Sequence, residues 1–241
     1  METVAVEWVK IAAPGLGVML AAVARPPGAG PFPAILVLHG SHGFAQEYVR
    51  LARDLSGGGL IAVAACWFRG GEGLGVAVVT PVACPDAPPM PGATSPDAMQ
   101  TVDALLKAIR GLRGARPDRI ALFGHSRGGG AVLNYMLRIG GARAVVLNSA
   151  GYPSQLVEAA SQANAPILML HGTADSPTDG GAALSNVQMA RDFESALLAA
   201  RKPVEAVFYE GGRHNGLFNN AAQYRDEVQR ILAFLQRYLR D

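Results

Sequence analysis

The sequence has little cysteine, little charge and no run of basic residues. Cys66 and Cys84 are its only cysteines, too few for a disulfide scaffold, and they lack metal-ligand spacing. A bridge between them is possible, but nothing in the sequence suggests one. Cys66 ends an apolar run and is expected to be a small core residue. Charged residues make up 17% and the net charge is +2, so we expect no nucleic-acid partner.

Long apolar segments are missing as well. No apolar run reaches the length of a membrane span, and residues 1–20 lack the basic start and the continuous apolar stretch of a signal peptide. We therefore expect a cytoplasmic protein with no membrane partner. Hydrophobic residues make up 50% of the 241 residues, enough to build one sizeable core. Residues 1–241 are expected to form a single domain, present as a monomer or a homodimer.

Short apolar runs alternate with helix-like runs from about residue 34 onward. The apolar runs are continuous, which is typical of strands buried on both faces. The alternation predicts a mostly parallel central sheet with helices on both faces. Before it, residues 3–11 and 17–26 predict an antiparallel hairpin. Residues 70–95 are rich in glycine and proline and predict a long loop near the active site.

Residues whose side chains can take part in catalysis follow four of the predicted strands, at 39–43, 124–128, 171–175 and 210–214. Ligands of such sheets bind where the strands end, so these loops are expected to converge. The second reads Gly-His-Ser-Arg-Gly between a buried strand and a helix. This pattern is typical of a nucleophile turn, which projects its serine, Ser126, clear of the backbone. Small residues at both ends let the strand and helix approach closely.

A serine hydroxyl needs a base, and the base needs an acid to orient it. His214 follows the last predicted strand and is the expected base. Asp175 is the expected acid, with Asp179 as its rival. His39 and His171 are expected to be structural residues at strand ends. The side chain of His125, directly before Ser126, is expected to point away from the nucleophile.

An oxyanion hole needs two backbone donors. One is expected to be the N–H of Arg127, and the other comes from Gly40, Ser41 or His42, of which we choose Ser41. The Arg127 side chain is expected to pair with a neighbouring carboxylate rather than with substrate. The His42 side chain is expected to touch substrate.

Two aromatic residues, Trp67 and Phe68, follow another predicted strand. They are expected to line the substrate pocket, with simple core packing as the alternative. No metal-ligand cluster and no phosphate-binding loop is recognisable in the sequence, so no metal or organic cofactor is expected.

The chain order Ser126, Asp175, His214 resembles that of the α/β-hydrolase superfamily, over roughly residues 15–240. Within it, the chain is most similar to the dienelactone-hydrolase-like branch. Members of that branch often carry H-G-x-x-D and Y-x-G-x-x-H, and here "HGTAD" ends at Asp175 and "YEGGRH" at His214. The resemblance implies an α/β-hydrolase fold without a large cap domain and without a cofactor.

The nucleophile departs from that branch. Dienelactone hydrolase proper has a cysteine, whereas this chain has Ser126, which favours carboxylic esters over dienelactones. The stretch "GHSRGGGAVL" also resembles bacterial cutinase-like polyester hydrolases, but those are secreted and usually have a different oxyanion loop.

These observations predict a carboxylesterase-type serine hydrolase that cleaves small to medium esters through an acyl-enzyme. A lactone-, dienelactone- or thioester-hydrolase is an alternative, because the same groups serve those reactions. A catalytically silent ligand-binding member is another, although all three catalytic positions are filled. A prolyl-oligopeptidase-type peptidase is less expected, since no additional domain that would gate peptides is recognisable.

Overall fold

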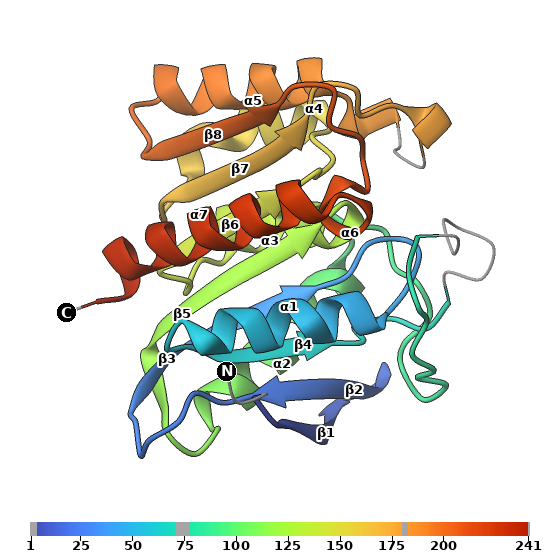
Figure 1. The fold of residues 1–241 in the computed structure, drawn as a ribbon. Coiled ribbons are helices and arrows are strands. Elements are labelled where there is room, and N and C mark those ends of the chain that lie inside the picture. Colours follow the sequence, from blue (N-terminus) through green and yellow to red (C-terminus); the bar gives the residue numbers. More distant parts are fainter. Residues whose placement is uncertain (1–3, 71–77, 180–182, 241) are drawn as a thin grey trace.

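A twisted sheet of eight strands runs through the centre of the computed structural model, which describes residues 4–70, 78–179 and 183–240 (Figure 1). The strand order is β1-β2-β4-β3-β5-β6-β7-β8; β2 pairs antiparallel with both β1 and β4, and β3 to β8 are parallel to one another. This confirms the predicted sheet and its N-terminal hairpin. The strands are β1 (Val6–Ala13), β2 (Gly17–Ala24), β3 (Phe32–Leu38), β4 (Ile61–Ala65), β5 (Ala115–His125), β6 (Ala144–Asn148), β7 (Ile167–Gly172) and β8 (Val204–Tyr209).

Helices cover both faces of the sheet, as predicted. α1 and α7 pack on one face, and α2, α3 and α5 pack on the other (Figure 1). The continuous apolar runs are explained by this arrangement, because every residue of β4 and β6 is buried. The helices are α1 (Gln46–Gly57), α2 (Pro96–Arg110), α3 (Arg127–Arg138), α4 (Ser154–Glu158), α5 (Val187–Ala199), α6 (Gly216–Asn219) and α7 (Ala221–Leu239), with 3-10 turns at Ala159–Gln162, Pro177–Asp179 and Ala183–Ser185.

The glycine- and proline-rich segment 70–95 is described only in part, because residues 71–77 lie outside the described residues. Its described part forms no helix or regular strand, and its contacts with the body include two isolated bridges, Ala45 to Pro81 and Arg69 to Pro89. α2 begins directly after it, where the Ser95 hydroxyl accepts a hydrogen bond from the Ala98 N–H at 3.2 Å. A serine in this position satisfies a helix donor that has no partner within the helix.

Cys66 and Cys84 form a disulfide across 18 residues, with their Cα atoms 6.6 Å apart. The sequence did not suggest this pairing, because only the fold brings the end of β4 beside the 78–95 segment. The bond ties that segment to the sheet. Disulfides persist mainly in oxidising compartments, so this bond stands against the cytoplasmic expectation. In the described part of the chain, no helix combines the length and apolar character needed to cross a membrane.

Candidate active site

Ser126 occupies the turn between β5 and α3 with a strained backbone, at φ 52° and ψ −115°. The flanking glycines explain how so sharp a turn is possible. A Cβ on Gly124 would lie 2.3 Å from the carbonyl carbon of Gly128, and one on Gly128 would lie 2.6 Å from the Leu38 oxygen. Neither position has room for a side chain. The predicted close approach of strand and helix is therefore confirmed.

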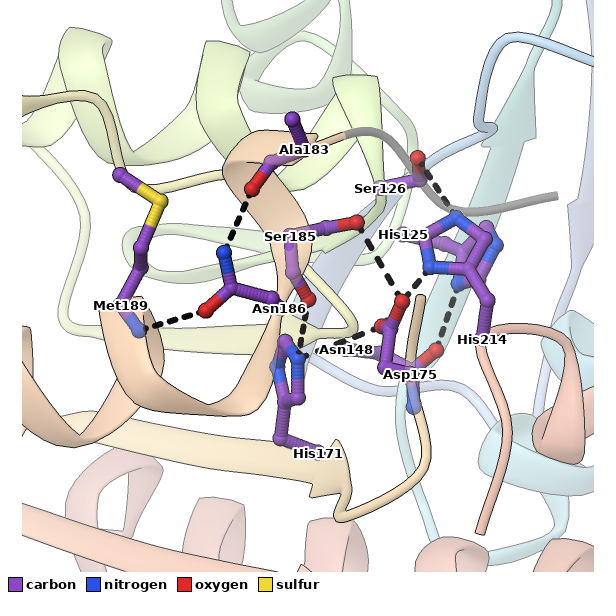
Figure 2. Close-up of polar contacts among 10 residues, drawn as sticks. All are labelled: His125, Ser126, Asn148, His171, Asp175, Ala183, Ser185, Asn186, Met189 and His214. Atoms are coloured by element: carbon purple, nitrogen blue, oxygen red, sulfur yellow. Dashed lines mark hydrogen bonds and ion pairs between the residues drawn. The ribbon is translucent and has the colours of Figure 1, made fainter. Parts of the chain in front are cut away.

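The loops after β5, β7 and β8 bring three predicted residues into contact (Figure 2). His214 Nε2 lies 3.0 Å from Ser126 Oγ, and His214 Nδ1 lies 2.8 Å from Asp175 Oδ2. Both Asp175 and His214 are buried. In this geometry the histidine donates from Nδ1 to the carboxylate and can accept the serine proton at Nε2. Asp179 lies in the 3-10 turn that follows Asp175.

Two further residues hold the Asp175 carboxylate (Figure 2). His171 Nε2 lies 3.2 Å from Asp175 Oδ2 and 2.6 Å from the Ser185 carbonyl oxygen, while the Ser185 hydroxyl donates to Asp175 Oδ1 at 3.3 Å. Burial opposes ionisation of this group, but the hydrogen bonds from His171 and His214 outweigh it, so the pKa of Asp175 lies below its usual value. The acid is thus ionised at neutral pH. The sequence indicates His171 as a residue at a strand end, but it gives no sign of the contacts of His171 and Ser185 with the acid.

The loop after β3 lies directly against the nucleophile. A Cβ on Gly40 would be 3.1 Å from Ser126 Cβ. Of the three expected oxyanion donors, Gly40 is already engaged, because its N–H donates to the Tyr48 hydroxyl at 2.9 Å. Ser41 and His42 remain as candidates, and Ser41 lines the same cavity as Ser126 and Arg127.

The His42 side chain is turned away from that cavity. The Tyr48 hydroxyl, which accepts from Gly40, donates to His42 Nε2 at 2.8 Å. Burial lowers the pKa of His42 to about 4, so the ring is neutral. His42 is absent from the residues lining the cavity beside Ser126. The expected contact between its side chain and substrate is therefore not supported by the structure.

The aromatic pair after β4 corrects a second expectation. Trp67 and Phe68 are fully buried in the core, and neither lines the cavity beside Ser126. The Trp67 indole donates to the His39 carbonyl oxygen at 2.9 Å, and both rings pack against the His39 ring. Trp67 and Phe68 therefore pack in the core, which was the alternative expectation.

A cavity of about 270 Å³ lies beside Ser126. It opens between the loops after β3, β5 and β6, the end of the 78–95 segment, α4 and the residues before α5. The sequence predicts a loop near the site over 70–95, but it gives no sign of the contributions of α4 and of the residues before α5. The lining residues are Ser41, Ala93, Thr94, Ser126, Arg127, Gly130, Gly151, Pro153, Gln155, Leu156, Leu184 and Ser185.

The Arg127 side chain bridges two walls of this cavity. Its Nε donates to Ser41 Oγ at 3.0 Å, and its Nη1 donates to the Pro91 carbonyl oxygen at 2.7 Å. The expected pairing with a carboxylate is wrong, because both partners are neutral oxygens. Burial lowers the pKa of Arg127 from its usual value. The side chain therefore joins the β3 loop to the 78–95 segment and leaves a positive charge at the cavity.

Within residues 4–70, 78–179 and 183–240, no group of three or more histidine, cysteine or acidic side chains is arranged to hold a metal ion. The hydrogen-bonded groups of the site are a serine, a histidine and a carboxylate.

Comparison with known proteins agrees with this architecture. The family model of the dienelactone hydrolase family matches residues 19–239. The chain belongs to the dienelactone hydrolase family. Membership of this family makes it a hydrolase with the α/β-hydrolase fold. Among curated proteins, no sequence matches the chain significantly.

Solved structures share the fold over nearly the whole chain. A candidate dienelactone hydrolase from Klebsiella pneumoniae subsp. pneumoniae has a TM-score of 0.73 at 22% identity, covering 97% of this chain and 100% of that one. A dienelactone hydrolase-like promiscuous phosphotriesterase from metagenomic libraries has a TM-score of 0.79 at 14% identity, covering 99% and 100%. An esterase from Pyrococcus furiosus has a TM-score of 0.75 at 13% identity, covering 98% and 94%. At these identities the likeness concerns the fold alone.

Proposed function

We propose that this member of the dienelactone hydrolase family is a serine hydrolase that cleaves carboxylic esters with small to medium acyl or alcohol groups. The observation that carries the proposal is the hydrogen-bonded chain from Ser126 Oγ through His214 to Asp175, with distances of 3.0 and 2.8 Å. A nucleophile, its base and the orienting acid within hydrogen-bond reach are the arrangement that activates a serine.

The proposed reaction has two halves. Ser126 Oγ attacks the ester carbonyl while its proton passes to His214 Nε2, and the ionised Asp175 stabilises the imidazolium that forms. The N–H groups of Arg127 and Ser41 stabilise the oxyanion. His214 then gives the proton to the departing alcohol, which leaves an acyl group on Ser126. Water activated by His214 attacks this acyl group and releases the acid.

The cavity supports a substrate of limited size. Its volume of about 270 Å³ lies just below the usual range for ligand pockets, roughly 300–1,000 Å³. Leu156 and Leu184 give it apolar walls, whereas Thr94, Gln155 and Arg127 are polar. A short acyl or alcohol chain fits this combination better than a long one.

Lactones and thioesters remain the alternative substrates, because they need the same nucleophile, base and oxyanion donors. A silent ligand-binding role is the other alternative. The strained serine argues against it, since positive φ at a non-glycine residue costs roughly 1–3 kcal/mol and persists mainly at functional sites.

Hydrolysis of p-nitrophenyl esters from acetate to octanoate tests the proposal. The wild type is expected to turn over the short esters best, and Ser126→Ala to lose roughly 10⁴-fold or more in kcat/KM. Ser161→Ala, which removes an exposed hydroxyl in a 3-10 turn, is the matched control and should keep full activity. Turnover no greater than that of Ser126→Ala would exclude a general esterase. Lactones and thioesters are then assayed in the same way. Hydrolysis of either would indicate a hydrolase with another substrate, and hydrolysis of neither would indicate a catalytically silent member.

A further inference from the structure

A buried carboxyl group lies behind the nucleophile turn and takes no part in the reaction proposed above. Glu227 on α7 is completely buried. Its Oε2 accepts a hydrogen bond from Asn148 Nδ2 at 2.6 Å, and its Oε1 accepts from Gln223 Nε2 at 2.7 Å. Burial raises the pKa of Glu227 to about 8. Burying an ionisable group is costly even when it is hydrogen-bonded.

Asn148 connects Glu227 to the nucleophile turn. It ends β6 and pairs in register with His125 at the end of β5. Its side-chain Oδ1 lies 2.6 Å from His125 Nδ1 (Figure 2), and its backbone oxygen accepts the Ser126 N–H at 2.9 Å. One residue therefore holds both the nucleophile and the residue before it.

The direction of these hydrogen bonds follows from the carboxylate. Above its pKa of about 8 the Glu227 carboxyl is ionised and can only accept, so Asn148 then presents its NH₂ group to Glu227. Its carbonyl oxygen must then face His125, and His125 Nδ1 must carry the ring proton. Burial holds the pKa of His125 well below its usual value, so this ring stays neutral with a lone pair on Nε2.

We propose that Glu227, in its ionised form, is a positioning residue that acts through Asn148 to hold His125 in a single tautomer and orientation beside Ser126. The effect on catalysis rests on the proposed serine-hydrolase function, whereas the effect on the tautomer does not. The effect of Glu227 reaches the site because the His125 ring lies between the loop after β3 and His214. A Cβ on Gly40 would be 2.8 Å from His125 Cδ2, and the His125 and His214 ring centres are 5.2 Å apart. The ring thus packs against the loop after β3 on one side and lies near the base on the other.

A purely structural role for Glu227 predicts something different. If the carboxyl only anchored α7 to the sheet, its removal would lower stability and leave the His125 ring unchanged. The position of the ring proton therefore separates the two roles.

The test is nitrogen NMR of the full chain with ¹⁵N-labelled histidine at pH 9, above the pKa of Glu227, with His125 signals assigned from His125→Gln. The wild type is expected to show His125 protonated on Nδ1 only. Glu227→Met, which has no acceptor, should give a mixture of tautomers. Glu227→Gln, which keeps one acceptor oxygen, should restore most of the Nδ1–H form. Asp226→Asn is the matched control, because Asp226 bonds Tyr209 and Arg230 instead.

Ester kinetics provide the second readout. At pH 9, Glu227→Met is expected to lower kcat roughly tenfold or more, as small misplacements of catalytic groups do, with KM unchanged, and Glu227→Gln should recover much of this. An Nε2–H tautomer in the wild type, or an unchanged single tautomer in a folded Glu227→Met, would overturn the proposal. The wild-type spectrum shows which ring nitrogen of His125 carries the proton even if Glu227→Met does not fold. Absence of ester hydrolysis in the wild type would count against the serine hydrolase and not against the tautomer.

Discussion

Replacing Asp175 with asparagine isolates the charge of the acid from its geometry. Both His171 and His214 donate to Oδ2, whereas Ser185 contacts Oδ1 through a hydroxyl that can also accept. The amide of Asp175→Asn should therefore place its oxygen at Oδ2 and its NH₂ toward Ser185. His214 then keeps the productive tautomer, and what is lost is the attraction between the carboxylate and the imidazolium.

The size of that loss follows from Coulomb's law. Two unit charges about 4 Å apart attract by about 4 kcal/mol at an effective dielectric of about 20. At 1.36 kcal/mol per factor of ten, kcat/KM should fall about 10³-fold. A reversed amide would also reverse the His214 tautomer, and a loss nearer 10⁴-fold would be expected.

The assay is p-nitrophenyl acetate hydrolysis by Asp175→Asn and by Asp179→Asn, the substitution of the rival acid. Asp179→Asn should stay within about twofold of wild type, since the carboxylate that accepts the hydrogen bond from His214 is that of Asp175. A loss of less than tenfold in Asp175→Asn, or an equal loss in both variants, would refute this assignment of the acid.

Three further predictions concern stability. Gly128→Ala should lower the free energy of unfolding in urea by about 2 kcal/mol or prevent folding, because its Cβ would lie 2.6 Å from a backbone oxygen; wild-type stability would contradict the close packing. The double variant Cys66→Ala/Cys84→Ala should lose about 3 kcal/mol, as expected for an 18-residue loop, and two thiols titrating in the denatured, unreduced wild type would rule out the bond. The pKa of His42 falls from 6.5 to about 4 on folding, so the unfolded chain binds more protons between these values. Stability should therefore decrease by about 3 kcal/mol as the pH falls from 6.5 to 4, and His42→Gln should remove that part of the slope; an unchanged slope would contradict burial of a neutral ring.

Most of the sheet could be predicted from the sequence because its signals are local. Continuous apolar runs identify strands buried on both faces, and Ser95 followed by Pro96 identifies the start of α2. Other boundaries depend on tertiary contacts and were missed. β5 begins at Ala115, earlier than its apolar run indicates, and the short α6 (Gly216–Asn219) has no sequence signal of its own.

The candidate site likewise combines residues with local sequence signals and residues whose contacts depend on the tertiary structure. Ser126, Asp175 and His214 each follow a strand, so the rule for parallel sheets brings them to one edge. Tyr48 and Glu227 lie within helices, where periodicity indicates only which side is buried and not which polar group outside the helix each side chain contacts. The same limit applies to Trp67 and Phe68, because an aromatic residue at a strand end can point into a pocket or into the core. Only the packed structure decides between these.

Covalent labelling with a fluorophosphonate tests the central claim most directly, because such reagents react with a serine that an adjacent base has activated. Peptide mass spectrometry should locate one adduct per chain on Ser126. The adduct should be absent from Ser126→Ala and form far more slowly in His214→Ala, which lacks the base. Failure to label the folded wild type, or an adduct on another residue that persists in Ser126→Ala, would contradict the assignment of Ser126 as the nucleophile of a serine hydrolase.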